Sequence, residues 1–320
     1  MSKLKLNVLL TYPYFSQEKK YKKFLREGLL DDDQYRIILD SGAYAVWNSP
    51  NNFPSIDIDK YCSFLDEWDF MKWRAVQLDV FGNPEQTKKN YRIFRERGYD
   101  VFPVFTRGDN LEFLEEIYNY TDYIMFGGIV IGGKNRNYVK WFHENNKGRK
   151  AHYLGFVNTK FLKAIKPYSC DSHSFMFCNK MGIFNYYDFN GNVPCFRYDQ
   201  FRKRFNDKIL FYLKKLGMKD KEIAYLLEKK ENWKGSNKDI LIGQYSIKDY
   251  HYKGINPFTF YSVVSHILRA IEFEQKMNVR IYFACTWSLN LEILLSAWYY
   301  VRDELWPRLE DQKRKLTQKS

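Results

Sequence analysis

The stretch YRIILDSG, residues 35–42, ends an apolar run on an aspartate and follows it with a Ser-Gly turn. Burying a carboxylate at the end of an apolar strand costs free energy unless another group uses or pairs it. Asp40 is therefore a candidate functional residue if the run 35–40 forms a buried strand.

Similar apolar runs recur along the chain. They cover residues 7–12, 75–81, 100–105, 122–131, 151–156, 168–172 and 280–285. Amphipathic helical patterns lie between several of them, at 57–68, 83–98, 110–120 and 159–166, and Asn83 and Asn110 are suitable N-cap residues. Strands that alternate with helices indicate a parallel sheet. Eight such runs predict an α/β fold of the (β/α)8 TIM-barrel type, because no glycine-rich dinucleotide fingerprint follows the first run.

A long segment, 173–257, separates the seventh run from the eighth and predicts a basic, mainly helical insertion within one catalytic barrel domain spanning 1–320. Residues 197–238 hold 13 Lys/Arg against six Asp/Glu, a surplus of seven within a chain of net charge +13. The pattern at 209–230 predicts two helices with a turn at Gly217. An ordinary αα-hairpin with a solvated basic face and a groove-reading helix-turn-helix both fit this pattern. A long helix is expected at 288–306, and the polar tail from 310 is expected to fray.

The net charge and the cysteine content indicate which partners and which cellular compartment to expect. A net charge of +13 favours a polyanionic partner, nucleic acid before a membrane surface. Five cysteines without a CxxC pair are typical of a reduced, intracellular protein. The most apolar stretch, 123–133, is too short and glycine-rich to span a bilayer. The sequence thus predicts a cytoplasmic protein that does not insert into a membrane.

Polar residues gather at the predicted carboxyl ends of the strands, where barrel enzymes place their active sites. Asp40, Asp79 and Asp171 end the second, third and seventh runs, and glycine turns end the fifth and sixth, at Gly127-Gly128 and Gly155. Each aspartate alone could be a helix cap or a loop-fixing residue. Three on one rim suit glycosyl transfer, in which one carboxylate attacks the sugar, a second exchanges a proton, and a third can bind the N–H groups of a guanine.

The motifs DSGAY (40–44), QLDVFG (77–82), FGGIVIGG (126–133), YLGF (153–156) and CDS (170–172) occur in this order. Together they resemble the tRNA-guanine transglycosylase family, over roughly residues 35–175. The DSGAY loop looks more like the DpdA-type branch found in phages and some bacteria, whose members exchange guanine in DNA for a 7-deazaguanine such as preQ0.

The resemblance implies a transglycosylase-like barrel, a pentosyltransferase activity without a cofactor, and specific roles at matching positions. Asp171 would be the covalent nucleophile and Asp40 the general acid/base. The base would be bound by residues of the same loops, namely Asp79, Ser41, Gly42, Tyr44, Gly127, Gly128 and Gly155. Independently of the resemblance, the positive charge of the insertion and of a glycine-rich loop predicts that nucleic acid is bound by Arg197, Arg202, Lys203, Arg204, Lys134 and Arg136.

The sequence departs from the tRNA enzymes in three ways, one of which is that the insertion and the C-terminus differ entirely. Their Gln-Gly-Gly turn after the fourth strand is replaced by FPVFTRGDN (102–110), so Thr106 or Arg107 would have to contact the base. Their structural zinc cluster is absent, since Cys178 and Cys195 lack paired spacing, and no metal is predicted. His173 follows Asp171 by two residues and could face the site or bond a loop. DNA is the expected nucleic acid, with tRNA as the alternative substrate and a non-catalytic DNA-binding protein as the alternative class.

Overall fold

A computed structural model of the chain describes residues 4–17, 33–68, 74–129, 136–176, 181–228, 255–286 and 288–318. The chain divides into two compact units. Unit 1 comprises residues 1–172 and 277–288, and unit 2 comprises residues 173–276 and 289–320. The predicted insertion, 173–257, lies within unit 2, which also includes later residues. No helix among the described residues has the length and apolar character needed to cross a bilayer.

Unit 1 is built on one parallel sheet with the order β4-β3-β2-β1-β11-β8-β7-β6-β5. Its strands are β1 (Leu6–Thr11), β2 (Tyr35–Asp40), β3 (Arg74–Val76), β4 (Val101–Phe102), β5 (Val104–Phe105), β6 (Tyr123–Phe126), β7 (Lys150–Tyr153), β8 (Ser169–Ser172) and β11 (Arg280–Cys285). Every pair within this sheet is parallel. Each of the eight apolar runs therefore contains a strand, and the predicted eighth strand, 280–285, has the predicted bounds.

The two ends of this sheet are consecutive pieces of chain, because only Pro103 separates β4 from β5. Residues 101–102 pair with β3 and residues 104–105 pair with β6. Proline has no N–H for a ladder bond, but the Pro103 carbonyl still accepts a bond from the N–H of Met125 at 2.8 Å. The sheet is thus nearly closed and barrel-like, compatible with a (β/α)8 barrel.

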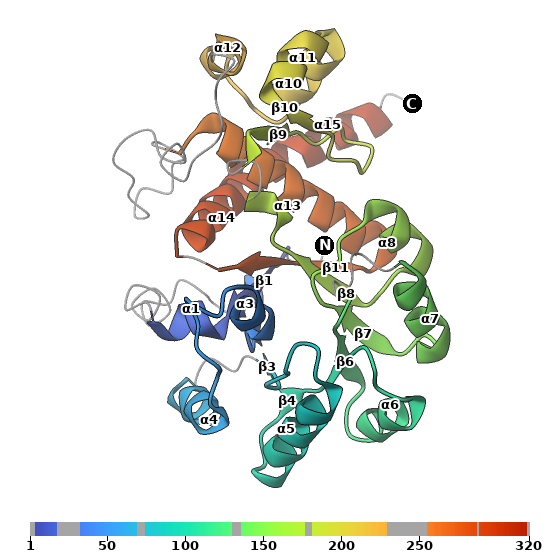
Figure 1. Cartoon of the computed structure of the whole chain (residues 1–320). Helices are drawn as coiled ribbons and strands as arrows, with labels where there is room; N and C mark the ends of the chain where they lie inside the picture. Colours follow the sequence, from blue (N-terminus) through green and yellow to red (C-terminus); the bar gives the residue numbers. More distant parts are fainter. Residues whose placement is uncertain are drawn as a thin grey trace. The chain divides into compact units, whose positions relative to one another are not determined.

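Helices cover the outside of this sheet (Figure 1). They are α1 (Tyr12–Gln17), α3 (Ala43–Asn48), α4 (Ile58–Glu67), α5 (Pro84–Glu96), α6 (Leu111–Tyr118), α7 (Arg136–Asn146) and α8 (Thr159–Ile165). The predicted N-caps are confirmed: Asn83 accepts a bond from the Gln86 N–H and Asn110 from the Phe113 N–H. Helices α1, α3 and α7 were not predicted from the sequence.

The inside of the barrel-like sheet holds an apolar cluster to which most of the strands contribute. Its buried residues are Leu9, Ile38, Val76, Phe102, Val104, Tyr123, Met125, Tyr282 and Ala284. Side chains two residues apart on a strand share a face. Asp40, two residues after Ile38, therefore lies on the inner face of the sheet at the carboxyl end of β2.

The third strand is shorter than predicted. The strand in the apolar run 75–81 was expected to end at Asp79, but β3 ends at Val76. Polar side chains of α5 take over the backbone groups beyond that point: Asn90 donates to the Leu78 carbonyl at 2.8 Å, and Thr87 Oγ1 accepts from the Val80 N–H at 2.9 Å. Asp79 therefore lies in a fixed loop after β3 rather than at the end of the strand itself.

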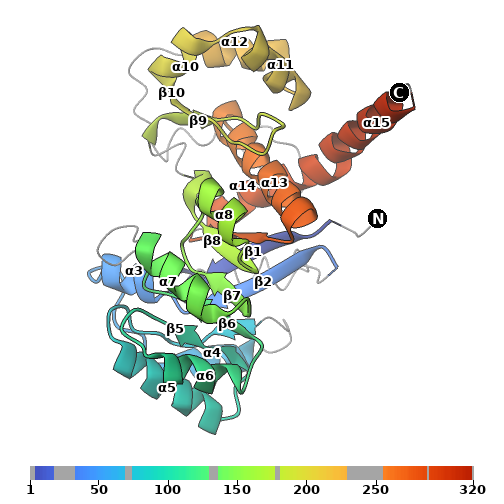
Figure 2. The ribbon, with the colours of Figure 1, turned by 90° about the vertical axis from the view of Figure 1, so that its right-hand side faces the viewer.

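Unit 2 is mainly helical. Its elements are the 3-10 turn η2 (Ser174–Met176), the strands β9 (Ile183–Asn185) and β10 (Cys195–Arg197), and the helices α10 (Tyr198–Arg204), α11 (Asp207–Lys215), α12 (Asp220–Glu228), α13 (Pro257–Met277), α14 (Ser288–Tyr300) and α15 (Trp306–Thr317), with a π-helical turn at Val301–Leu305. Strands β9 and β10 form an antiparallel hairpin close to α10 (Figure 2).

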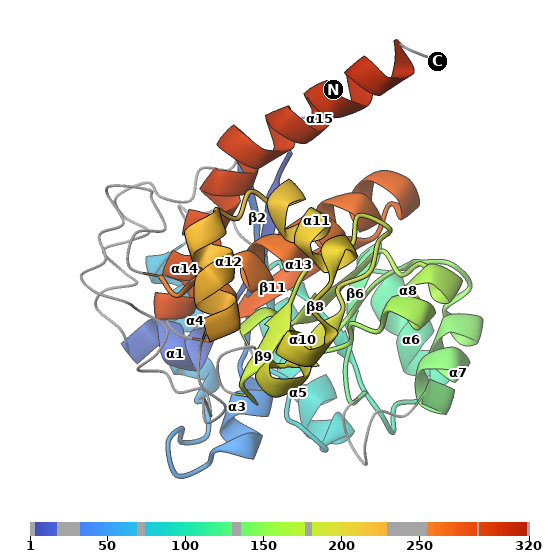
Figure 3. The same cartoon turned by 90° about the horizontal axis from the view of Figure 1, so that it is seen from above.

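The predicted pair of helices around Gly217 is confirmed as α11 and α12. Gly217 has a φ of +94°, and a Cβ at this position would lie 2.0 Å from the Tyr300 hydroxyl, so the turn requires glycine. The expectation of a frayed tail is wrong, because α15 continues to Thr317 and points away from the other helices of unit 2 (Figure 3). Leu309 is buried and gives this helix an apolar contact.

Candidate active site

Asp40 is held at the carboxyl end of β2 by the turn that follows it. Its Oδ2 accepts a hydrogen bond from the Gly42 N–H at 3.0 Å. Gly42 has a φ of +85°, and a Cβ there would lie 2.2 Å from Cδ of Pro13. Only glycine can adopt this conformation against Pro13 without strain, so the Ser-Gly turn of the sequence fixes one oxygen of the carboxyl group.

Asp79 is joined to the same turn by Ser41. The Ser41 hydroxyl donates to Oδ1 of Asp79 at 2.5 Å, and Ser41 Oγ accepts from the Ala43 N–H at 3.3 Å. Ser41 is fully buried, whereas Asp79 is half-buried. The loops after β2 and β3 thus bring Asp40 and Asp79 together, and one oxygen of Asp79 is free of the Ser41 bond.

Asp171 lies on β8 and is buried, with 6% of its surface exposed. Its Oδ1 accepts two hydrogen bonds, from the Gly155 N–H at 2.7 Å and from Nε2 of His152 at 3.1 Å. Gly155 has a φ of +67°, and a Cβ placed there would meet no atom within 4 Å, so open space adjoins this turn. Two N–H groups therefore converge on one oxygen of the Asp171 carboxyl group.

His152 belongs to a chain of buried side chains inside the sheet. Its Nδ1 lies 2.7 Å from Ser169 Oγ, and Ser169 Oγ lies 2.5 Å from the Tyr123 hydroxyl. These contacts form a consistent series if the Tyr123 hydroxyl donates to Ser169 and the Ser169 hydroxyl donates to Nδ1 of His152. Nε2 of His152 then carries the proton and donates it to Asp171. His152 is completely buried, and these hydrogen bonds hold its ring in the orientation that points Nε2 toward Asp171.

The three carboxyl groups share one electrostatic environment. Burial, and to a smaller extent the negative charges of Asp79 and Asp171, raise the pKa of Asp40 to about 8. The hydrogen bond from the Gly42 N–H lowers this pKa and so limits the rise. Burial raises the pKa of Asp79 to about 6, and the Ser41 hydrogen bond limits the rise. At pH 7 most Asp40 side chains therefore carry a proton, while Asp79 is mostly ionised.

Tyr44 lies on α3, four residues after Asp40, in an exposed aromatic cluster. Tyr44 and Trp47 are 50% and 56% exposed. Phe81, two residues after Asp79, packs against both, with ring centroids 5.6 Å from Tyr44 and 4.6 Å from Trp47. The cluster has exposed rings, and its residues follow Asp40 and Asp79 closely in the sequence. Such rings can stack on a planar ligand.

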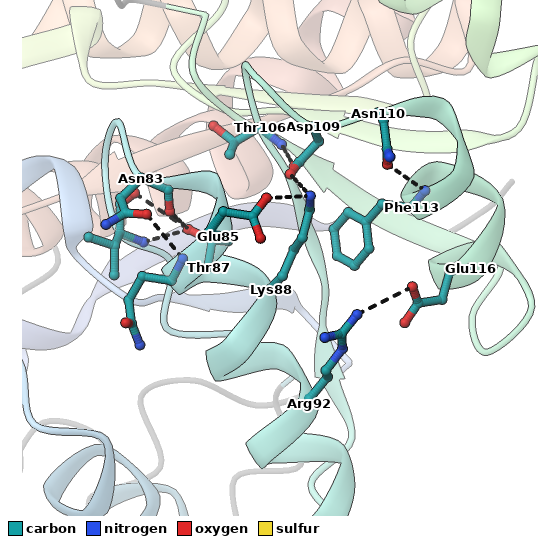
Figure 4. A network of polar contacts seen from close by, with 12 residues as sticks. Asn83, Glu85, Thr87, Lys88, Arg92, Thr106, Asp109, Asn110, Phe113 and Glu116 are labelled. Atoms are coloured by element: carbon teal, nitrogen blue, oxygen red, sulfur yellow. Dashed lines mark hydrogen bonds and ion pairs between the residues drawn. The ribbon is translucent and has the colours of Figure 1, made fainter.

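The loop after β5 stands where the resemblance leads one to expect a base-reading glutamine. Its backbone is held by Asp109, whose Oδ2 accepts from the Thr106 N–H at 2.7 Å and whose Oδ1 lies 3.4 Å from Nζ of Lys88 (Figure 4). Lys88 also contacts Glu85. Arg107 lies over the ring of Tyr138. These contacts give Thr106 and Arg107 structural roles in the loop.

The remaining predicted residues fall in several places. Gly127 donates its N–H to the Phe105 carbonyl, and a Cβ on Gly128 would lie 2.8 Å from Thr106 Oγ1, so this pair allows β6 to pack against the loop after β5. Arg136 is exposed at the start of α7 and lies over Phe161. Lys134 lies outside the described residues. Arg197 and the Arg202–Arg204 run are exposed in unit 2.

His152 is the residue of this site that was not selected from the sequence. A single histidine in the apolar run 151–156 has no ligand spacing. One signal was available, because His152 lies on a strand next to the one that carries Asp171. Within the described part of the chain, no group of three His, Cys, Asp or Glu side chains is arranged to hold a metal ion.

Comparisons with known proteins give no match to this chain among protein-family models, curated proteins or solved structures.

Proposed function

We propose that this protein is a transglycosylase that exchanges guanine in DNA for a 7-deazaguanine base through a covalent aspartyl-glycosyl intermediate. The observation that carries the proposal is that the carboxyl groups of Asp171 and Asp40 have different surroundings. One oxygen of Asp171 receives two N–H donors, while Asp40 has a pKa of about 8 and keeps a proton at neutral pH. Two carboxyl groups in such different environments are typical of nucleophile and acid/base pairs.

In the first half-reaction, an oxygen of Asp171 attacks C1′ of the target deoxyguanosine. A C–O bond forms, the C1′–N9 bond breaks, and the departing guanine takes the proton of Asp40 on a ring nitrogen. In the second, the entering base gives its N9 proton to Asp40, N9 attacks C1′, and the bond to Asp171 breaks. Two inversions give retention at the sugar. Retention places the paired carboxyl groups about 5–5.5 Å apart.

Base recognition in this proposal depends on Asp79 and the aromatic cluster. Asp79 is mostly ionised at pH 7, and its second oxygen can accept hydrogen bonds from the ring and amino N–H groups of guanine. Tyr44 offers an exposed ring on which the base can stack. The target nucleotide has to leave the duplex stack to reach the end of a barrel, so the substrate is a flipped or unpaired nucleotide.

The test is mass spectrometry of nucleosides released from DNA after incubation with the enzyme and preQ0. The wild type should convert deoxyguanosine to the 7-deaza nucleoside, and Asp171→Asn should abolish conversion without weakening DNA binding. Glu112→Gln, an exposed carboxylate-to-amide change on α6, is the matched control and should remain active. Full activity of Asp171→Asn would refute the nucleophile, and conversion of tRNA instead of DNA would reassign the substrate.

The pH profile gives a second test of the same assignment. Asp40 has to be protonated for the first half-reaction and Asp79 ionised to bind the base. The value of kcat/KM should therefore rise through about pH 6 and fall through about pH 8. A profile that is flat from pH 6 to 9 would contradict both roles.

A further inference from the structure

Unit 2 contains a groove with a volume of about 660 Å³. Its lining residues belong to the β9–β10 hairpin, to the end of α10 and its connection to α11, and to α11 itself. The hairpin is anchored to α13, because Ser262 Oγ and Ser265 Oγ accept bonds from the N–H groups of Asn185 and Tyr187. The groove therefore belongs to an ordered part of the unit.

Four aromatic residues line this groove, Tyr186, Phe196, Phe205 and Tyr212, and three of their rings lie close to parallel. Tyr186 and Phe196 are nearly parallel, with an interplanar angle of 7° and centroids 6.0 Å apart, and Tyr212 lies 25° from Tyr186 at the same separation. Tyr186 is only 5% exposed and forms the floor, whereas Phe196 and Tyr212 are half-buried. Planar bases stack on such rings whatever their identity.

Three cations line the same groove: Lys203, Arg204 and Lys208. All three side chains are exposed, and none forms an ion pair with a carboxylate of the described chain. The Arg204 guanidinium lies 5.5 Å from the centroid of the Phe196 ring.

Four lysines elsewhere in unit 2, in contrast, do form ion pairs. Lys214, Lys276, Lys313 and Lys315 each lie within salt-bridge distance of an aspartate or glutamate. The groove also contains one carboxylate, Asp188, which accepts bonds from the N–H groups of Asn190 and Asn192. The groove lining thus has three cations against one carboxylate, a net charge of +2, and none of the three cations forms an ion pair within the described part of the chain.

We infer that this groove binds a single-stranded segment of a polynucleotide, with bases stacked on Phe196 and Tyr212 and phosphates held by Lys203, Arg204 and Lys208. Aromatic faces combined with unpaired cations fit exposed bases joined by phosphates, which a paired duplex does not offer together. The inference rests on the proposed function for its biological substrate, since base exchange requires an unpaired nucleotide. Binding itself can be measured without base exchange.

The experiment measures binding of a fluorescein-labelled 12-nucleotide single strand, and of its duplex, to the full chain by anisotropy over a salt series without any 7-deazaguanine. The triple variant Lys203→Ala/Arg204→Ala/Lys208→Ala should lower the log–log salt slope by about 2, since each single-strand phosphate contact contributes about 0.7. Extrapolated from 1 M salt, that slope corresponds to a loss of about 100-fold in affinity at 0.1 M salt.

The charge-matched control is Lys140→Ala/Lys313→Ala/Lys315→Ala, which removes three paired surface lysines and should change the affinity less than threefold. Phe196→Leu should weaken single-strand binding at least about fivefold without changing the salt slope, and Phe196→Tyr should bind like the wild type. Circular dichroism and melting curves confirm that the variants are folded.

An unchanged salt slope in the groove triple variant, or equal losses in the control, would overturn the inference. So would tighter binding of the duplex that is insensitive to Phe196→Leu. These outcomes are separate from the proposed chemistry. Strand binding without preQ0 incorporation would refute the transglycosylase activity but not the binding groove. Incorporation of preQ0 together with normal strand binding by the triple variant would refute the groove but not the transglycosylase activity.

Discussion

Asp40→Asn should make the protein more stable, and the gain should depend on pH. The folded chain raises the pKa of Asp40 from an ordinary 3.8 to about 8, so between these values the folded state binds a proton that the unfolded state has released. Stability therefore falls as the pH rises from about 4 to about 8. An amide carries no charge to desolvate, and its oxygen can still accept from the Gly42 N–H.

The size of the gain follows from the same values. One pKa unit corresponds to about 1.4 kcal/mol, so at pH 7 the unfavourable contribution of Asp40 reaches about 4 kcal/mol. Asp40 is half-buried rather than fully enclosed, and solvent screening reduces this to about 2–4 kcal/mol. For a chain of 320 residues, with an unfolding entropy of about 2.1 cal/mol/K per residue, this corresponds to an increase of about 3–6 °C in Tm.

The assay is thermal unfolding of wild type and Asp40→Asn at several pH values between 4 and 8. We expect a difference of under about 1 kcal/mol at pH 4, growing toward pH 8, together with slower base exchange. Glu112→Gln, at an exposed carboxylate of α6, should show no pH-dependent difference. Destabilisation by Asp40→Asn at pH 7, or a gain that does not grow with pH, would refute the electrostatic description of this site.

Three further substitutions test other contacts. His152→Phe removes the Nε2 donor to Asp171 but keeps a ring in the sheet interior. Single-turnover base exchange should slow about 10- to 100-fold with DNA affinity unchanged, and an unchanged rate would exclude the positioning role. Gly42→Ala places a Cβ against Pro13 at a positive φ, and urea unfolding should reveal a loss of at least about 1–3 kcal/mol; a neutral result would contradict the turn geometry. Lys88→Met leaves the buried carboxylate of the loop after β5 without its cation. Its cost should be about 3–5 kcal/mol in the same assay, compared with under about 0.5 kcal/mol for the exposed Lys89→Met.

The strands of the barrel-like sheet could be predicted from the sequence because each is a short apolar run followed by a turn signal. The end of β3 could not, because side chains of α5 take over the backbone groups of Leu78 and Val80. That competition depends on tertiary contacts rather than on the run itself. Helix α13 was missed for a related reason: it is buried on nearly all sides and has no polar face to give it a helical period.

The candidate site could be predicted in part. Asp40 and Asp171 are found by their position at strand ends, and the raised pKa of Asp40 follows from burial beside other carboxylates. His152 was missed, because its contact with Asp171 becomes evident only once β7 is paired with β8. The same holds for the groove of unit 2, where Tyr186 and Phe196 meet across a hairpin.

The position of β11 in the sheet has a consequence for biosynthesis. This strand pairs with both β1 and β8, yet it begins at Arg280, more than 100 residues after β8 ends. At ordinary translation speeds the ribosome needs about 5–20 s to cover that distance. During that interval the edges of β1 and β8 have no partner, and such edges readily pair with other chains. The nascent protein therefore passes through an aggregation-prone stage that ends only when one late segment is inserted, and chaperone demand should be concentrated there.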